Sequence, residues 1–152
     1  EFKDHLYLIN KYTNICILPY VIENNILSKI GVINDFNFVR NKNIPTLLTG
    51  IKNSDNISDM DSANDLLIKY SNININNATN WMFLGDLFSN KLSDSSIKLY
   101  CVDVSDKLDE FIKNKSNFYF INVEESILSD DMLLLSGYLR LFNLFYAQHI
   151  NK

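Results

Sequence analysis

Three aspartates and a lysine between positions 59 and 69 are the side chains of this sequence best suited to chemistry. Carboxylates such as Asp59, Asp61 and Asp65 supply the oxygen ligands that Mg²⁺ prefers, and a bound cation could neutralise a diphosphate and activate water. Asp61, Asp65 and Lys69 are spaced by four residues, so they share one helical face, and the acid-before-base order favours an i,i+4 ion pair. Two interpretations stay open: a solvated helical surface, or a cation site that draws further oxygens from elsewhere.

A helix over residues 59–71 is predicted to carry these side chains. An apolar stripe at helical spacing runs along it, made of Met60, Ala63, Leu66, Leu67 and Tyr70. Ser58 is a suitable N-cap, and aspartates in the first turn favour the positive end of the helix dipole. Before the helix come a short strand over 45–50, which ends at Gly50, and a polar loop.

This succession of strand, glycine, polar loop and helix resembles the Nudix box, Gly-x5-Glu-x7-Arg-Glu-U-x-Glu-Glu-x-Gly-U, in which U is aliphatic. With the first glycine on Gly50 and no gap, the later box residues fall in order on Asn56, Asn64, Asp65, Leu66, Ile68, Lys69 and Ser71. The resemblance continues over about residues 14–150, through Leu84-Gly85-Asp86-Leu87 and through the acidic turn at Glu124 and Glu125. It implies a Nudix-like domain with a degenerate box.

Nudix enzymes hydrolyse a nucleoside diphosphate linked to another group, using Mg²⁺ held by glutamates of the box helix. At the matching positions only Asp65 keeps a carboxylate, Ile68 offers no ligand, and Lys69 would repel a cation. The resemblance therefore implies a domain that is silent for the family reaction and needs no cofactor. We expect it to act as a structural or protein-binding module in a larger assembly.

In an alternative interpretation, the domain still hydrolyses nucleoside diphosphates linked to another group. In a divergent metal-dependent pyrophosphatase for nucleoside-diphosphate sugars or ADP-ribose, Mg²⁺ would be held by Asp59, Asp61 and Asp65, joined by Glu124 or Glu125. A third possibility is an α+β adaptor whose box spacing is coincidental.

Aromatic residues in the early strands are the candidates for holding a nucleotide, because the fold that the resemblance implies often stacks a nucleobase there. Tyr20, Phe36 and Phe38 lie in these strands. Their default role is the hydrophobic core.

The order of the elements predicts an α+β fold, a Nudix-like mixed curved sheet flanked by helices as an α/β/α sandwich. The strands are expected over 13–20, 26–33, 35–40, 45–50, 81–88, 97–104 and 118–123, and the helices over 59–71, 106–113 and 129–149. A turn at Asn34-Asp35 would make 26–33 and 35–40 a hairpin, and Pro19 suits a strand end or edge. Residues 1–12 are expected to be an arm or the end of a preceding region, and 13–152 a single domain.

The predicted helix over 129–149 is apolar around most of its circumference, apart from a stripe of Ser136, Arg140 and Asn143. Such a helix is either deeply buried or docks on other protein chains as well as on its own sheet. The heavy use of Asn, Ile and Lys is typical of an AT-rich genome, as in many bacteriophages, so a virion is one expected setting. The chain opens on Glu1 rather than methionine, so we expect it to be part of something longer.

Composition and the positions of charged, cysteine and histidine residues argue against several other classes of function. A net charge of −4 with 21% charged residues argues against nucleic-acid binding. No signal peptide and no membrane-spanning run is visible, so we expect a cytoplasmic or virion protein that is neither secreted nor transmembrane. Cys16 and Cys101 lie in apolar strands and are expected to be buried thiols. His5 and His149, near the chain ends, make a histidine metal site or triad improbable.

Overall fold

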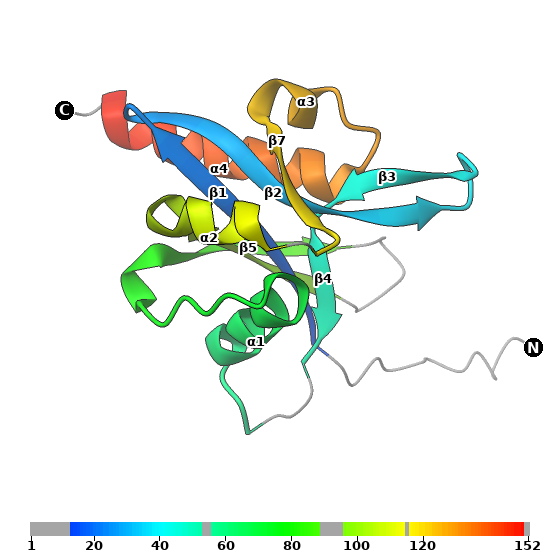
Figure 1. Cartoon of the computed structure of the whole chain (residues 1–152), viewed down its shortest axis with the longest axis horizontal. Helices are drawn as coiled ribbons and strands as arrows, with labels where there is room; N and C mark the ends of the chain where they lie inside the picture. The colour runs from blue at the N-terminus through cyan, green and yellow to red at the C-terminus, as the bar shows by residue number, and fades with distance from the viewer. Residues whose placement is uncertain (1–12, 53–55, 89–95, 115, 151–152) are drawn as a thin grey trace, which may run out of the picture.

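The other elements of the fold are arranged around one central strand, β1 (Asn14–Glu23). The computed structural model describes residues 13–52, 56–88, 96–114 and 116–150, and Figure 1 shows the whole chain. The arm predicted over 1–12 and His5 lie outside the described residues, as does the side chain of His149.

Within the described residues, seven strands form one mixed sheet in the order β3-β2-β1-β6-β5, with β4 also paired to β1 and β7 to β2. Strands β1 and β6 are parallel, and the remaining pairs are antiparallel. The strands after β1 are β2 (Ile26–Asn37), β3 (Lys42–Thr46), β4 (Leu48–Ile51), β5 (Trp81–Phe88), β6 (Ser96–Asp103) and β7 (Phe118–Asn122).

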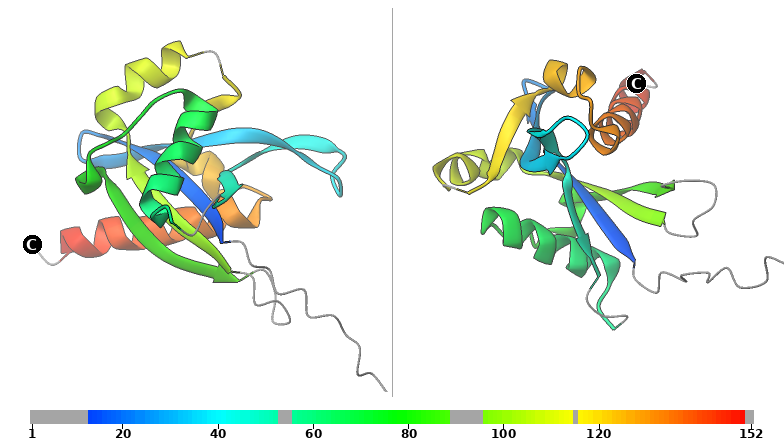
Figure 2. Two further views of the ribbon diagram at one scale, coloured as in Figure 1. Left: turned by 90° about the horizontal axis from the view of Figure 1, so that it is seen from below. Right: turned by 90° about the vertical axis from the view of Figure 1, so that its right-hand side faces the viewer.

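Helices cover both faces of the sheet, as the edge-on view in Figure 2 shows. Helices α1 (Asp59–Ser71) and α2 (Leu108–Lys113) lie on one face, and α3 (Val123–Ile127) and α4 (Met132–Ile150) lie on the other. Two short 3₁₀ turns, η1 (Ala78–Asn80) and η2 (Ser105–Lys107), connect them to strands. The predicted α+β class and α/β/α sandwich are confirmed.

Strand β1 is buried on both faces because helices cover it on each side. Ile15, Ile17 and Val21 belong to the core under α1, whereas Cys16 and Leu18 belong to the core under α4. Alternation with a period of two sends successive side chains to opposite faces. The two cysteines are free and buried, as predicted, and burial raises the pKa of the Cys101 thiol to about 12.

Pro19 lies inside β1 rather than at its end, so that part of the prediction was wrong. The carbonyl of Tyr20 accepts the N–H of Val104 on the β6 side, and therefore the nitrogen of Pro19 faces the other edge. On that edge β1 pairs with β4 as far as Ile17 and with β2 from Tyr20 onward. A residue that has no N–H is tolerated because it falls where β1 changes partner.

The hairpin predicted around Asn34-Asp35 was also wrong, because residues 26–37 form one strand. Neither residue adopts positive φ. Asn24 and Asn25 do, with φ of 54° and 63° in the turn between β1 and β2, and Asn41 does so with 50° in the turn between β2 and β3. Asparagine tolerates this left-handed backbone, so these positions make the turns.

The single strand predicted over 45–50 is two strands. Thr46 on β3 pairs with Ile33 of β2, and Leu48 on β4 pairs with Ile17 of β1. Buried Leu47 lies where the chain passes from one partner strand to the other. Sequence periodicity cannot show such a change, because both halves are equally apolar.

The last helix begins at Met132 rather than at residue 129, because the Asp131 carboxylate accepts the N–H of Leu134 at 2.7 Å and caps it. The short helix α3 before it was not predicted. Deep burial of the last helix is excluded, because four of its apolar side chains are exposed: Met132, Leu139, Phe142 and Leu144. None of the described helices is long and apolar enough to cross a membrane.

Candidate functional site

Helix α1 runs from Asp59 to Ser71, as predicted, and both of its ends are capped by side chains or backbone. The Ser58 hydroxyl oxygen accepts the N–H of Asp61 at 3.0 Å and donates to the Asp61 carboxylate at 2.6 Å. At the other end Asn72 adopts φ of 57°, and its N–H donates to the carbonyl of Ile68. The loop-then-helix frame expected from the box is therefore present.

A pocket of about 380 Å³ lies between α1 and the end of β4. Among its described lining residues the charged ones are Asp65 and Lys69, whose formal charges cancel. Gly50 allows α1 to come this close, because a Cβ there would lie 2.6 Å from Cδ1 of Leu66. This is the place that the box alignment marks as the candidate site.

The ion pair expected between Asp65 and Lys69 is not formed among the described contacts. The ammonium of Lys69 instead lies 5.5 Å from the centre of the Tyr70 ring. Asp61, Asp65 and Lys69 are all exposed, as the interpretation of a solvated helical face expects.

At two box positions the side chains form hydrogen bonds with nearby residues of α1 and of the connector that follows it. Asn64, in the place of the box arginine, donates to the side-chain oxygen of Asn74 at 2.6 Å and accepts the N–H of Ile75 at 3.2 Å. Ser71, in the place of the closing glycine, donates to the carbonyl of Leu67 at 2.7 Å and is buried. Both side chains fix the helix and its following connector. Neither faces a carboxylate that it could orient.

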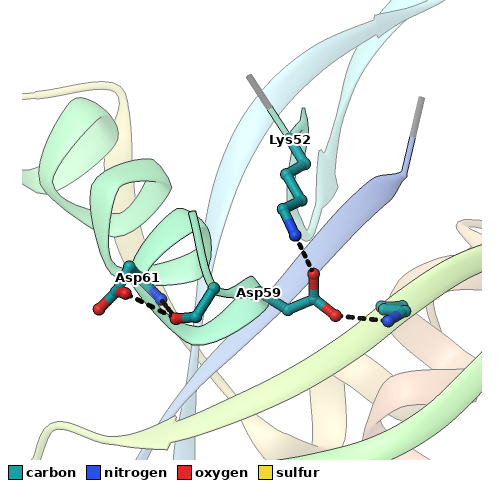
Figure 3. Close-up of polar contacts among 5 residues, drawn as sticks. Lys52, Asp59 and Asp61 are labelled. Carbon is teal, nitrogen blue, oxygen red and sulfur yellow. Dashed lines mark hydrogen bonds and ion pairs between the residues drawn. The ribbon is translucent and has the colours of Figure 1, made fainter. Parts of the chain in front are cut away.

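The carboxylate of Asp59 is paired with two lysines, of which Figure 3 labels Lys52. The ammonium of Lys52, just after β4, lies 2.9 Å from one carboxylate oxygen, and the ammonium of Lys98 on β6 contacts the other. Hydrogen bonds from Lys98 and then Lys52 lower the pKa of the Asp59 carboxyl, and the bond to Asp59 raises the pKa of Lys98. The carboxylate of Asp59 therefore joins the N-terminus of α1 to the sheet.

Replacing Asp59 by asparagine is expected to lower the free energy of unfolding at neutral pH by about 1–2 kcal/mol, because two charge-assisted hydrogen bonds are lost at a partly solvated site. Since the folded-state pKa of Asp59 is lowered, its stabilisation is complete above the unfolded value of about 4 and is lost as the pH falls through the lower folded value. Urea denaturation at several pH values measures the difference.

The matched control is Asp61→Asn in the same helical turn. Its side chain is exposed and, in the described part of the chain, hydrogen-bonds only Ser58, so we expect a loss of a few tenths of a kcal/mol. An Asp59→Asn difference that stayed constant down to about pH 2 would show that the ion pairs do not account for it.

The other acids considered for a cation site do not join this pocket. Glu124 and Glu125 lie in the first turn of α3, on the opposite face of the sheet. In the described ranges no three His, Cys, Asp or Glu side chains come close enough together to hold a metal ion. One carboxylate beside an ammonium does not fit Mg²⁺, which takes several oxygen ligands.

The three aromatic candidates are dispersed. Tyr20 is 8% exposed and lies in the core under α4. Phe36 and Phe38 lie near the turn between β2 and β3, where their rings meet edge to face at 5.1 Å, and Phe38 is 87% exposed. Only these two of the three offer a ring face to a ligand.

Sequence reasoning missed Lys52 and Lys98, the two residues that form ion pairs with Asp59 and lower the pKa of its carboxyl group. A signal was present at Lys98, because a lysine within the apolar run of β6 needs a partner for its charge. Which carboxylate it meets could not be predicted, since Asp59 lies 39 positions away along the chain.

Solved structures with the same fold include several Nudix hydrolases. An ADP compounds hydrolase superposes with a TM-score of 0.66 at 10% identity, over 91% of this chain and 75% of that one. A MutT/Nudix family protein from Listeria innocua gives 0.63 at 10%, over 93% and 96%. The Ap4A hydrolase of C. elegans gives 0.59 at 13%, over 89% and 98%.

No protein-family model matches the chain, and no curated protein matches it in sequence. The likeness to the solved structures is one of fold. It shows that the predicted Nudix-like domain is correct and that the sandwich described above is the Nudix fold.

Proposed function

We propose that this chain is a Nudix-fold module that has lost diphosphate hydrolysis and acts by binding other proteins. The observation that carries the proposal is the charge of the box pocket, where Asp65 supplies the single carboxylate among the described lining residues and shares that lining with the ammonium of Lys69. The state of Asp59 supports it, because a carboxylate that already holds Lys52 and Lys98 is a poor ligand for an added cation.

The binding half of the proposal is supported by apolar side chains that the fold leaves uncovered. Leu128 after α3 is 84% exposed, and Met132 at the start of α4 is 71% exposed. The only charged group near the middle of α4, Arg140, is half-buried and donates to the carbonyl of Leu84 on β5 at 3.0 Å. The helix therefore turns its charge toward the sheet and leaves apolar groups outside, as at a protein contact. A virion would be one such assembly.

The test is to incubate the chain with ADP-ribose or Ap4A in the presence of Mg²⁺ or Mn²⁺. Hydrolysis is measured as the release of a nucleoside monophosphate. We expect no release above the metal-only blank, and no change on Asp65→Ala, because one carboxylate cannot position the cation that the reaction needs.

The matched control is Asp109→Ala on α2, where an exposed aspartate is followed three and four residues later by Ile112 and Lys113, as Asp65 is by Ile68 and Lys69. Metal-dependent release that disappears in Asp65→Ala and persists in Asp109→Ala would replace this proposal by the divergent pyrophosphatase.

A further inference from the structure

A groove of about 620 Å³ lies on the face of the sheet opposite α1. The second half of α4 forms one wall, and the turn between β1 and β2 with the start of α3 forms the other. Neither the box pocket nor any box residue takes part in it.

The α4 wall is a ladder of three aromatic rings. Tyr138, Phe142 and Tyr146 are spaced by four residues, so they lie on one helical face. The ring centres of Tyr138 and Phe142 are 5.8 Å apart, and those of Phe142 and Tyr146 are 4.4 Å apart. On the opposite wall Ile26 is 58% exposed. Tyr138 is only 4% exposed and belongs to the core under α4, so the groove presents the rings of Phe142 and Tyr146 and the aliphatic group of Ile26 to solvent.

Among the described residues that line the groove, the two charged ones are both acidic, Glu23 and Glu124. The carboxylate of Glu23 is already paired with Lys29 at 2.6 Å and accepts the hydroxyl of Ser28. In the described part of the chain the carboxylate of Glu124 makes no hydrogen bond and no ion pair. Burial, and then the neighbouring Tyr146 and Glu124, raise the pKa of Tyr138. The uncompensated negative charge therefore lies close to the rings.

We propose that this groove binds an arginine side chain presented by a partner protein. A guanidinium stacks on aromatic faces and forms two parallel hydrogen bonds with a carboxylate. One arginine side chain could therefore stack on the aromatic rings of the groove and pair with Glu124 at the same time. A phosphate or nucleotide would be repelled by the unpaired carboxylate of Glu124, and an apolar segment alone would leave that carboxylate desolvated without a partner. The inference rests on the proposed function, whose partner chemistry it names.

The test is a titration of the ¹⁵N-labelled chain with the capped tripeptide acetyl-Gly-Arg-Gly amide, observed by NMR. We expect fast-exchange shifts at Tyr138, Phe142 and Tyr146, with a dissociation constant on the order of 1 mM for so small a probe. The same tripeptide with citrulline in place of arginine keeps the shape without the charge and is expected to bind about fivefold more weakly or less.

Glu124→Gln is expected to weaken binding of the arginine peptide by about fivefold. Glu110→Gln is the matched control, because Glu110 is likewise an exposed acid in the first turn of a helix, α2, outside the groove. The inference is overturned if millimolar arginine peptide shifts none of the three aromatic residues, if citrulline binds equally well, or if Glu124→Gln and Glu110→Gln behave alike.

These outcomes are separate from the fate of the proposed function. Hydrolysis of ADP-ribose would refute catalytic silence and leave the groove result standing. A groove that ignored arginine, in a chain without hydrolysis, would refute only the partner chemistry named here.

Discussion

Replacing both Ile68 and Lys69 by glutamate is expected to create a divalent-cation site that binds Mn²⁺ on the order of 100-fold more tightly than the unsubstituted chain does. Positions 68 and 69 lie three and four residues after Asp65, on the same side of α1. The double substitution adds two carboxylates and removes an ammonium, so the formal charge of the three positions changes from 0 to −3. Isothermal titration calorimetry or electron paramagnetic resonance with Mn²⁺ measures the affinity.

The chain supplies a matched control for this experiment. Asp109, Ile112 and Lys113 repeat the same spacing on α2, where Ile112 is 66% exposed. Ile112→Glu with Lys113→Glu therefore creates the same set of charges on an open helical surface. We expect the α1 variant to bind Mn²⁺ more tightly, because two of its three carboxylates, at positions 65 and 69, border a pocket formed with β4.

Two results would contradict the account of the box. Equal gains on α1 and α2 would show that the pocket contributes nothing beyond local charge. Tight Mn²⁺ binding by the unsubstituted chain, unaffected by the new glutamates, would show that existing residues already hold a cation.

The repeated spacing also explains why the sequence predicted the frame of the site better than its chemistry. An aspartate followed by isoleucine and lysine at three and four residues is an ordinary pattern for a solvated helix, and α2 carries it on an exposed surface. Helix α1 could be predicted because its signals lie close together in the sequence: the cap at Ser58, the apolar stripe and Gly50. Helix bounds follow from interactions within four residues, and these are visible in sequence.

The parts that sequence could not predict all depend on remote partners. Pro19 is acceptable in β1 only because β4 and β2 share that edge, and the second carboxylate oxygen of Asp59 is paired only because Lys98 reaches it from β6. Likewise, an apolar α4 was compatible with deep burial or with a free face until the sheet beneath it was known. Patterns of period two and 3.6 identify which face is apolar, and they do not identify what covers it.

Replacing Gly31 by alanine is expected to lower the free energy of unfolding by about 3 kcal/mol, the larger of the two stability effects argued for this chain. A Cβ at Gly31 would lie 2.5 Å from Cζ of Phe118 and 2.9 Å from Cβ of Pro19. Neither neighbour can yield easily. Phe118 meets the rings of Phe111 and Phe120 at 5.2 Å each, and Pro19 is fixed by its own ring in the central strand.

Gly137→Ala on α4 is the control that separates close contact from the general cost of an added methyl group. Its Cβ would also lie 2.9 Å from neighbours, but these are the terminal methyl groups of Leu18 and Leu47, which can rotate away. Alanine is also favoured over glycine within a helix by about 1 kcal/mol, so the net change is expected to stay within about 1 kcal/mol of zero. Urea denaturation of both variants measures the contrast. An equal loss of stability in both variants would show that the short distance of the added Cβ to its neighbours, and not the rigidity of those neighbours, determines the loss. No loss in Gly31→Ala would show that the rings of Phe111, Phe118 and Phe120 can shift to accommodate the methyl group.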